Sequence, residues 1–147
     1  MESHRSLDSA WWALRIGLGL AAFLAGLDKF FNILTDWSLY VSPFTERLLP
    51  ISVGAFLAVV GVIEMLVGLA VLTVWTRFGA YVAAVWLLAV SVNLLFTGQF
   101  LDIAVRDVAM AIAAYTLARL TEARQPAEEA GLSLTEALRT GGHGTAA

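Results

Sequence analysis

The chain has 147 residues, of which 59% are hydrophobic and 14% are charged, and its formal net charge at pH 7 is −3. Soluble domains carry about 25% charged residues, so this composition excludes an ordinary soluble protein and predicts one small membrane domain. With no basic surface and no nucleic-acid-binding motif in the sequence, we expect no nucleic acid partner.

Four apolar stretches are long enough to cross a bilayer, which takes about 20 mainly apolar residues in a helix. They cover residues 10–27, 50–75, 78–96 and 103–120. Each must be a helix, because unpaired backbone groups are prohibitive in lipid and the chain is too short for a closed barrel. The sequence therefore predicts an all-α fold, a bundle of four transmembrane helices over residues 10–120, with polar terminal segments at 1–9 and 121–147.

The connections between these stretches differ in length. Thr76 and Arg77 form a short turn that makes the second and third helices an antiparallel hairpin, whereas 28–49 is a longer connection. In the polar C-terminal segment, 125–129 has the composition of a linker, 132–139 is expected to form a short helix capped by Ser133, and 141–147 a mobile tail. A cleaved signal peptide is the competing interpretation of the first stretch, which is longer than a usual signal core.

Basic residues near the span ends predict the orientation. Arg5, Arg77, Arg119 and Arg124 would lie at one end of the bundle, and Lys29 and Arg47 at the other. The first set exceeds the second, so both termini are predicted to be cytoplasmic. We expect an integral protein of a prokaryotic cytoplasmic membrane, in contact with the lipid bilayer and with other membrane protein subunits.

Cysteine is absent, which removes disulfides, iron–sulfur ligation and cysteine-based zinc sites. The only histidines, His4 and His143, lie in the polar terminal segments, so none is available within a span to bind haem. Met65 and Met110 would be weak axial ligands. We therefore expect no metal site and no intrinsic cofactor.

Small residues predict the faces on which the helices pack. Gly54, Gly61 and Gly68 are spaced by seven, and Glu64 opens onto the same side of that helix. On the first helix, three small residues share one face with Arg15: Gly19, Ala22 and Gly26. Whether these glycines only pack or also line a functional groove, Glu64 is directed toward the interior of the bundle.

Glu64 is a lone carboxylate near the middle of the second stretch. A charge at that depth costs about 2.5–3.5 kcal/mol on insertion scales, so it needs a partner or a function. Arg15 could reach it from the inner side and Arg106 from the outer side, and the sequence leaves both pairings open.

Two interpretations of the polar residues within the spans remain. In the functional one, Glu64 exchanges protons and Arg106 stabilises a reduced quinone as the catalytic residues. Asn93 and Tyr115 hydrogen-bond the quinone, and Trp86 contacts its ring. In the structural one, a charge network locks the helices together. Its further members are Arg15, Asp28, Lys29 and Asp107.

The chain resembles the DoxX-like family of small four-helix membrane proteins over 15–120. The resemblance rests on a set of short motifs in this order: Arg15-x-Gly17-x-Gly19, Gly26-Leu27-Asp28-Lys29-Phe30, Gly61-Val62-Ile63-Glu64 with Gly68, Arg77-Phe78-Gly79-Ala80, Asn93, and Arg106-Asp107. It implies a four-helix integral membrane protein, in some members linked to quinone-dependent electron transfer. One such member is a membrane subunit of a thiosulfate:quinone oxidoreductase, but nothing in this chain identifies a thiosulfate site.

The sequence thus predicts either of two functions. The first is a quinone-interacting or accessory subunit of a membrane electron-transfer complex, which needs a redox partner because the chain has no redox group of its own. The second is a non-catalytic subunit that packs against, or helps to assemble, a larger respiratory or photosynthetic complex. A small transporter is a weaker third interpretation, because no inverted repeat supports it.

Overall fold

Helices are the only regular secondary structure in the part that the computed structural model describes, residues 2–141, with side chains described for 5–124 and Ser133. Four long helices are α1 (Glu2–Asp28), α3 (Val53–Leu72), α4 (Thr76–Thr97) and α5 (Leu101–Gly141). Between α1 and α3 lie the short 3-10 helix η1 (Trp37–Tyr40) and the short helix α2 (Pro43–Leu48).

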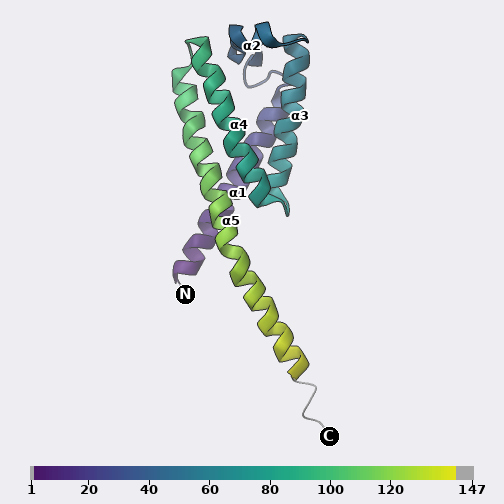
Figure 1. The fold of residues 1–147 in the computed structure, drawn as a ribbon, viewed down its shortest axis with the longest axis vertical. Coiled ribbons are helices and arrows are strands. Elements are labelled where there is room, and N and C mark those ends of the chain that lie inside the picture. Colours follow the sequence, from purple (N-terminus) through teal and green to yellow (C-terminus); the bar gives the residue numbers. More distant parts are fainter. Residues whose placement is uncertain (1, 142–147) are drawn as a thin grey trace.

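The long helices pack mainly in two pairs, α1 with α3 and α4 with α5, which are joined through contacts between α3 and α4 and between α1 and α5 (Figure 1). Helix α2 lies at one end of the molecule, which we call the α2 end. The N-terminal part of α1 and the long continuation of α5 extend past the other end, which we call the terminal end (Figure 1).

Among the described residues, three segments are long and apolar enough to cross a membrane: Arg5–Asp28, Val53–Leu72 and Thr76–Thr97. They correspond to the first three predicted spans, and the chain is therefore an integral membrane protein. Helix α5 is not among them, because Arg106, Asp107 and Arg119 interrupt its apolar part.

Helices α1, α4 and α5 extend beyond the predicted spans, whereas α3 is shorter than the predicted 50–75. Helix α1 begins at Glu2, within the segment expected to be a polar N-terminal tail, and α5 runs without a break to Gly141. The linker predicted at 125–129 is therefore wrong, and the helix predicted at 132–139 is part of α5, so Ser133 lies within a helix and not at its N-terminus. The many Ala, Glu, Leu and Arg residues of this region favour helix over linker. Of the predicted tail, 142–147 lie outside the described residues.

Glycines bring α1 and α3 into backbone contact. A Cβ on Gly26 would lie 2.5 Å from the carbonyl oxygen of Gly61, and one on Gly68 would lie 2.7 Å from that of Gly19. The predicted packing faces are thus confirmed at these four positions. Gly54 is different: a Cβ there would meet nothing within 4 Å, because α1 ends before it reaches that level of α3.

Candidate functional site

Helix α1 stops before it reaches the α2 end, whereas its neighbour α3 continues to that end. The last residues of α1 lie opposite Gly61 and Glu64, and α3 continues beyond Gly61 for about 12 Å at 1.5 Å per residue. Residues 29–52, which include η1 and α2, fill this space, and we call them the connecting segment. Irregular backbone at such a depth must find its hydrogen-bond partners within the protein.

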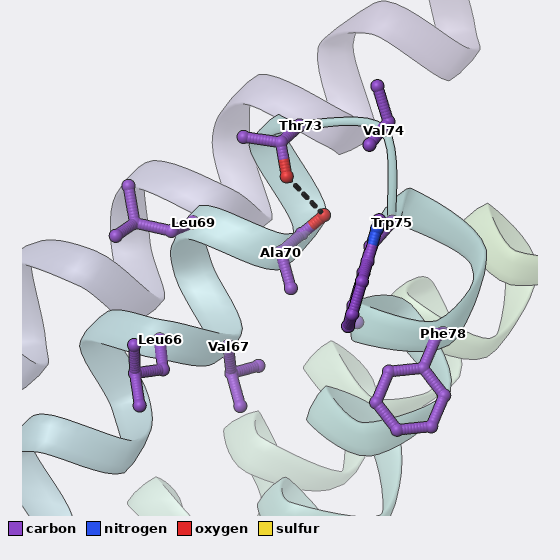
Figure 2. A pocket seen from close by; sticks show the side chains of 9 residues that line it. Leu66, Val67, Leu69, Ala70, Thr73, Val74, Trp75 and Phe78 are labelled. Atoms are coloured by element: carbon purple, nitrogen blue, oxygen red, sulfur yellow. Dashed lines mark hydrogen bonds between the residues drawn. The ribbon is translucent and has the colours of Figure 1, made fainter.

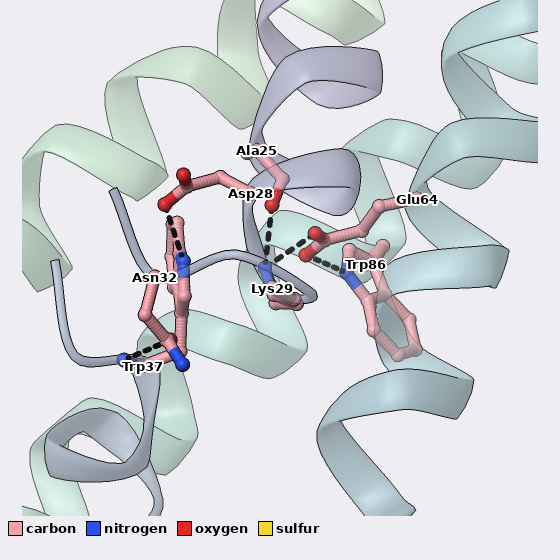
Figure 3. A network of polar contacts seen from close by, with 7 residues as sticks. All are labelled: Ala25, Asp28, Lys29, Asn32, Trp37, Glu64 and Trp86. Carbon is pink, nitrogen blue, oxygen red and sulfur yellow. Dashed lines mark hydrogen bonds and ion pairs between the residues drawn. The ribbon is translucent and has the colours of Figure 1, made fainter. Parts of the chain in front are cut away.

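The carboxylate of Asp28, the last residue of α1, supplies several of these partners. It accepts hydrogen bonds from the backbone N–H groups of Ile33 (2.9 Å) and Leu34 (3.1 Å), and from the indole Nε1 of Trp37 (2.8 Å; Figure 3). The Asp28 residue is only 7% exposed. It therefore fixes the point at which the chain leaves the helix, and it holds Trp37 beside the neighbouring Lys29.

Lys29 and Glu64 form a buried ion pair, with Lys29 Nζ 2.5 Å from Glu64 Oε2 and the two side chains 6% and 13% exposed. The other carboxylate oxygen, Oε1, accepts a hydrogen bond of 3.2 Å from Trp86 Nε1 on α4 (Figure 3). Lys29 Nζ also lies 3.7 Å from the ring centroid of Trp37, a cation–π contact. One carboxylate on α3 thereby joins the end of α1 to α4.

Neither pairing considered for Glu64 from the sequence is found. The sequence places Lys29 at the membrane surface, because the first apolar stretch ends just before it. In the structure α1 stops opposite the middle of α3, and Lys29 therefore reaches Glu64 directly. A lysine at this position satisfies the carboxylate with no contribution from Arg15 or Arg106.

Arg15 instead closes the end of α3 at the terminal end. Its guanidinium donates to three successive carbonyl oxygens, those of Val71 (3.1 Å), Leu72 (2.8 Å) and Thr73 (2.5 Å). The last carbonyls of a helix have no partner within the helix, and a cation is favoured there by the helix dipole. Arg15 thus belongs to the structural network, through helix capping and not through Glu64.

Asn93 attaches the connecting segment to α4. Its side-chain Oδ1 accepts from the backbone N–H of Ser42 (3.2 Å) and from Thr45 Oγ1 (2.7 Å), and its Nδ2 donates to the carbonyl of Tyr40 (2.6 Å). Both ends of the amide are therefore engaged by η1 and the start of α2.

The remaining candidates lie apart from Glu64. Arg106 has a side chain that is 66% exposed, and its Nε lies 3.7 Å from Oδ1 of the buried Asp107. Tyr115 is 52% exposed and lies toward the terminal end, with its ring 6.1 Å from that of Tyr81. Of the predicted quinone site, the structure brings only Glu64 and Trp86 together.

Among the described residues, two of the apolar hollows on the surface of the helices are relevant here. One, of about 310 Å³, is lined by Phe30, Ala58, Val59, Val62 and Ile63. The other, of about 400 Å³, lies where α3 turns into α4 and includes Trp75 and Phe78 (Figure 2). Glu64 lines neither, although Phe30 and Ile63 are the sequence neighbours of Lys29 and Glu64.

Sequence reasoning missed two features of this site. One is the contact of Trp37 with Asp28 and Lys29, and the other is the contact of Ser42 and Thr45 with Asn93. No local spacing predicts the Trp37 contact, because Asp28 lies 9 residues earlier and only the irregular backbone between them brings the two side chains to hydrogen-bond distance. Among the described residues, no group of three or more His, Cys, Asp or Glu side chains is placed to hold a metal ion.

Comparison of the chain with protein-family models, with curated proteins and with solved structures finds no match.

Proposed function

We propose that this chain is a DoxX-like integral membrane protein that acts as an accessory subunit of a membrane electron-transfer complex, with a structural role there. The observation that supports this best is the Lys29–Glu64 ion pair. Both oxygens of the Glu64 carboxylate are engaged, one by Lys29 and one by Trp86, and the two charged side chains are almost fully buried. A carboxylate held in this way joins three helices.

The other polar groups support the same proposal. Asp28 and Asn93 hold the connecting segment, and Arg15 caps α3. Every buried side-chain nitrogen and oxygen atom in the described part of the chain has a hydrogen-bond partner. Such closed networks stabilise a fold, and they leave the outward apolar faces for lipid and for other membrane subunits.

We further propose that α5 is a fourth span, with both termini in the cytoplasm of a prokaryotic cell. Asp107 is buried among the helices, and Arg106 and Arg119 lie near the two ends of the apolar part, where long side chains reach the interface. Four spans place both termini on one side. The excess of arginines at the terminal end favours the cytoplasm for that side.

The proposal is tested by purifying a tagged chain from native membranes in mild detergent and identifying the co-purifying proteins by mass spectrometry. We expect a stoichiometric redox enzyme of the membrane. Deleting the chain should lower the amount of assembled complex and leave the electron-transfer rate per assembled complex unchanged. Normal assembly in the deletion strain would rule the accessory function out.

A second candidate function is quinone binding beside Glu64. It is favoured by the apolar hollow whose lining includes Phe30 and Ile63, the sequence neighbours of Lys29 and Glu64. The quinone would then depend on Glu64 for proton exchange, with Lys29 and Trp86 beside it. Arg106, Asn93 and Tyr115 have no direct part in this version, because they lie elsewhere.

Glu64→Gln in the intact complex distinguishes the two candidates, because glutamine keeps the shape of the side chain and cannot take up a proton near neutral pH. If quinone chemistry occurs here, turnover per assembled complex should fall about 100-fold, and solvent extracts of the purified complex should contain quinone. Arg106→Gln is the matched control and should leave turnover unchanged. Unchanged turnover in Glu64→Gln together with a quinone-free extract would exclude this candidate.

A further inference from the structure

A second polar cluster lies between α4 and α5 at the terminal end, away from Glu64. Its centre is the carboxylate of Glu122, which contacts Arg77 Nε at 3.0 Å and Arg119 at 2.5 Å. The hydroxyl of Tyr81 donates to the same carboxylate at 3.0 Å. Two arginines from different helices are thus held side by side on one acidic group.

The cluster has an excess positive charge. The hydrogen bond from Tyr81, with the charges of Arg119 and Arg77, holds the pKa of Glu122 below its ordinary value, so this carboxylate is ionised at neutral pH. One negative charge then faces two positive charges. The side chains of Arg77 and Arg119 are 53% and 59% exposed, and they contact Glu122 through Nε of Arg77 and Nη1 of Arg119. A guanidinium has five N–H donors, whose geometry suits phosphate oxygens.

The surroundings of the cluster are those of a membrane interface. Tyr115 lies one turn before Arg119 on α5, toward the apolar part of the helix. Its ring meets that of Tyr81 edge-on at 6.1 Å, and the residue is 52% exposed. Trp75 and Phe78 are exposed at the start of α4, and such aromatic side chains are typical of the level of lipid headgroups. The arginines therefore lie at the level of the lipid phosphates, and the exposed Tyr115 lies beside them toward the apolar part of the membrane.

We propose that Arg77 and Arg119 together bind the headgroup phosphate of an anionic glycerophospholipid, with Tyr115 against its glycerol and upper acyl region. The positive charge complements the phosphate, and the aromatic surface complements the apolar part that only a lipid brings. Basic sites between transmembrane helices are a recurrent form of lipid headgroup recognition. Glu122 orients the two guanidinium groups and limits their net charge.

The test uses the full-length, delipidated protein in detergent. Native mass spectrometry measures binding of phosphatidylglycerol and of phosphatidylcholine. We expect preferential binding of phosphatidylglycerol, and the double variant Arg77→Gln/Arg119→Gln should weaken it by about tenfold or more. Binding of phosphatidylcholine should not change. Arg106→Gln, which removes another exposed arginine of α5, is the control and should bind phosphatidylglycerol as the unsubstituted protein does.

A variant with the opposite expected effect guards against a folding defect. Glu122→Gln keeps both arginines and removes the competing carboxylate, so phosphatidylglycerol should bind more tightly. Equal binding of the two lipids, or undiminished phosphatidylglycerol binding in the double variant, would overturn the proposal. Displacement of phosphatidylglycerol by an equal concentration of inorganic phosphate would also overturn it, because the ligand would then be the free anion.

Discussion

Lys29 and Glu64 meet in surroundings where separate charges are costly. Removing two charges from water is compensated only when the geometry is good and the remaining hydrogen-bonding groups are satisfied. Trp86 satisfies the second oxygen of Glu64, and the Trp37 ring lies against the ammonium group of Lys29. Each residue is therefore tolerated at this depth only because the other is present.

We expect Lys29→Met to lower the free energy of unfolding by about 3–5 kcal/mol, because it leaves the Glu64 carboxylate buried and unpaired. The double variant Lys29→Met/Glu64→Gln removes both charges and should recover most of that loss. Thermal unfolding of the purified proteins in one mild detergent measures both. A double variant as unstable as the sum of the two single variants would show that the residues do not act as a pair.

Single residues also show where sequence reasoning stops. The depth of Glu64 along its apolar stretch predicts that it is interior, and the structure agrees, with a side chain 13% exposed. Its partner depends on where the preceding helix ends relative to α3. Lys29 is only 35 residues from Glu64 in the chain, but no local pattern specifies that α1 stops opposite the middle of its neighbour.

The pair of helices α1 and α3 shows how an element-level contact depends on glycine. At Gly26 the two backbones are so close that any side chain would meet main-chain atoms of Gly61 and Met65, at 2.5 and 2.8 Å. Backbone cannot move aside as the end of a flexible side chain can. Close approach of this kind gives the van der Waals contact that holds helices together in lipid. The hydrophobic effect does not drive them together there, because lipid tails are as apolar as the helix surfaces.

Gly26→Ala should therefore destabilise the protein by about 1–3 kcal/mol, through forced separation of α1 and α3. Gly17→Ala on the same helix is the matched control, since its Cβ would meet nothing within 4 Å. It should be neutral or stabilising by up to about 1 kcal/mol, from helix propensity. Detergent unfolding of both variants tests the contrast, and equal effects of the two would contradict the packing described for α1 and α3.

The connecting segment is the element that the sequence predicts least well. It lacks the long apolar runs of the spans. Its conformation depends on contacts with Asp28, which directly precedes it, and with Asn93, which lies far along the chain on α4. Those residues are recognisable as polar groups near span ends, but a sequence does not specify that they serve irregular backbone. The long helices are predictable because apolar length alone requires them in lipid.

Asp28→Asn should loosen this segment while the long helices stay packed. The substitution replaces charge-assisted acceptors for the N–H groups of Ile33 and Leu34 with weaker neutral ones. We expect about tenfold faster hydrogen exchange at these two amides. Asp36→Asn, which changes an exposed carboxylate of the same segment, should leave them unchanged. Protection of Ile33 and Leu34 equal to that of the unsubstituted protein would show that Asp28 does not hold the segment.

For the whole molecule, the two pairs of helices are fastened where α1 and α5 cross near the terminal end. Trp11 Nε1 donates to Thr121 Oγ1 at 2.8 Å, and Asp8 forms an ion pair with Arg124. Trp11 is buried in the cluster that includes Val71 and Leu117. Because α1 and α5 are held to each other at the terminal end, the proposed fourth span would cross the membrane in the same direction as α3.

This arrangement predicts the side of the membrane on which each turn lies, and the absence of native cysteine makes labelling of single introduced cysteines free of background. Leu39→Cys in η1, Val74→Cys between α3 and α4, and Ala123→Cys after the apolar part of α5 all replace exposed residues. A membrane-impermeant maleimide should label the Leu39 position in intact cells. It should reach the other two only after the membrane is permeabilised.

The Ala123 position decides whether α5 is a fourth span. If α5 is a span, its contacts with α1 put this position on the same side as Val74 and the N-terminus, and the arginine distribution predicts that this side is cytoplasmic. Labelling of Ala123→Cys together with Leu39→Cys in intact cells would mean that α5 does not cross. Labelling of the Val74 and Ala123 positions alone would keep the four spans and reverse their orientation, so the experiment separates the architecture from its direction in the membrane.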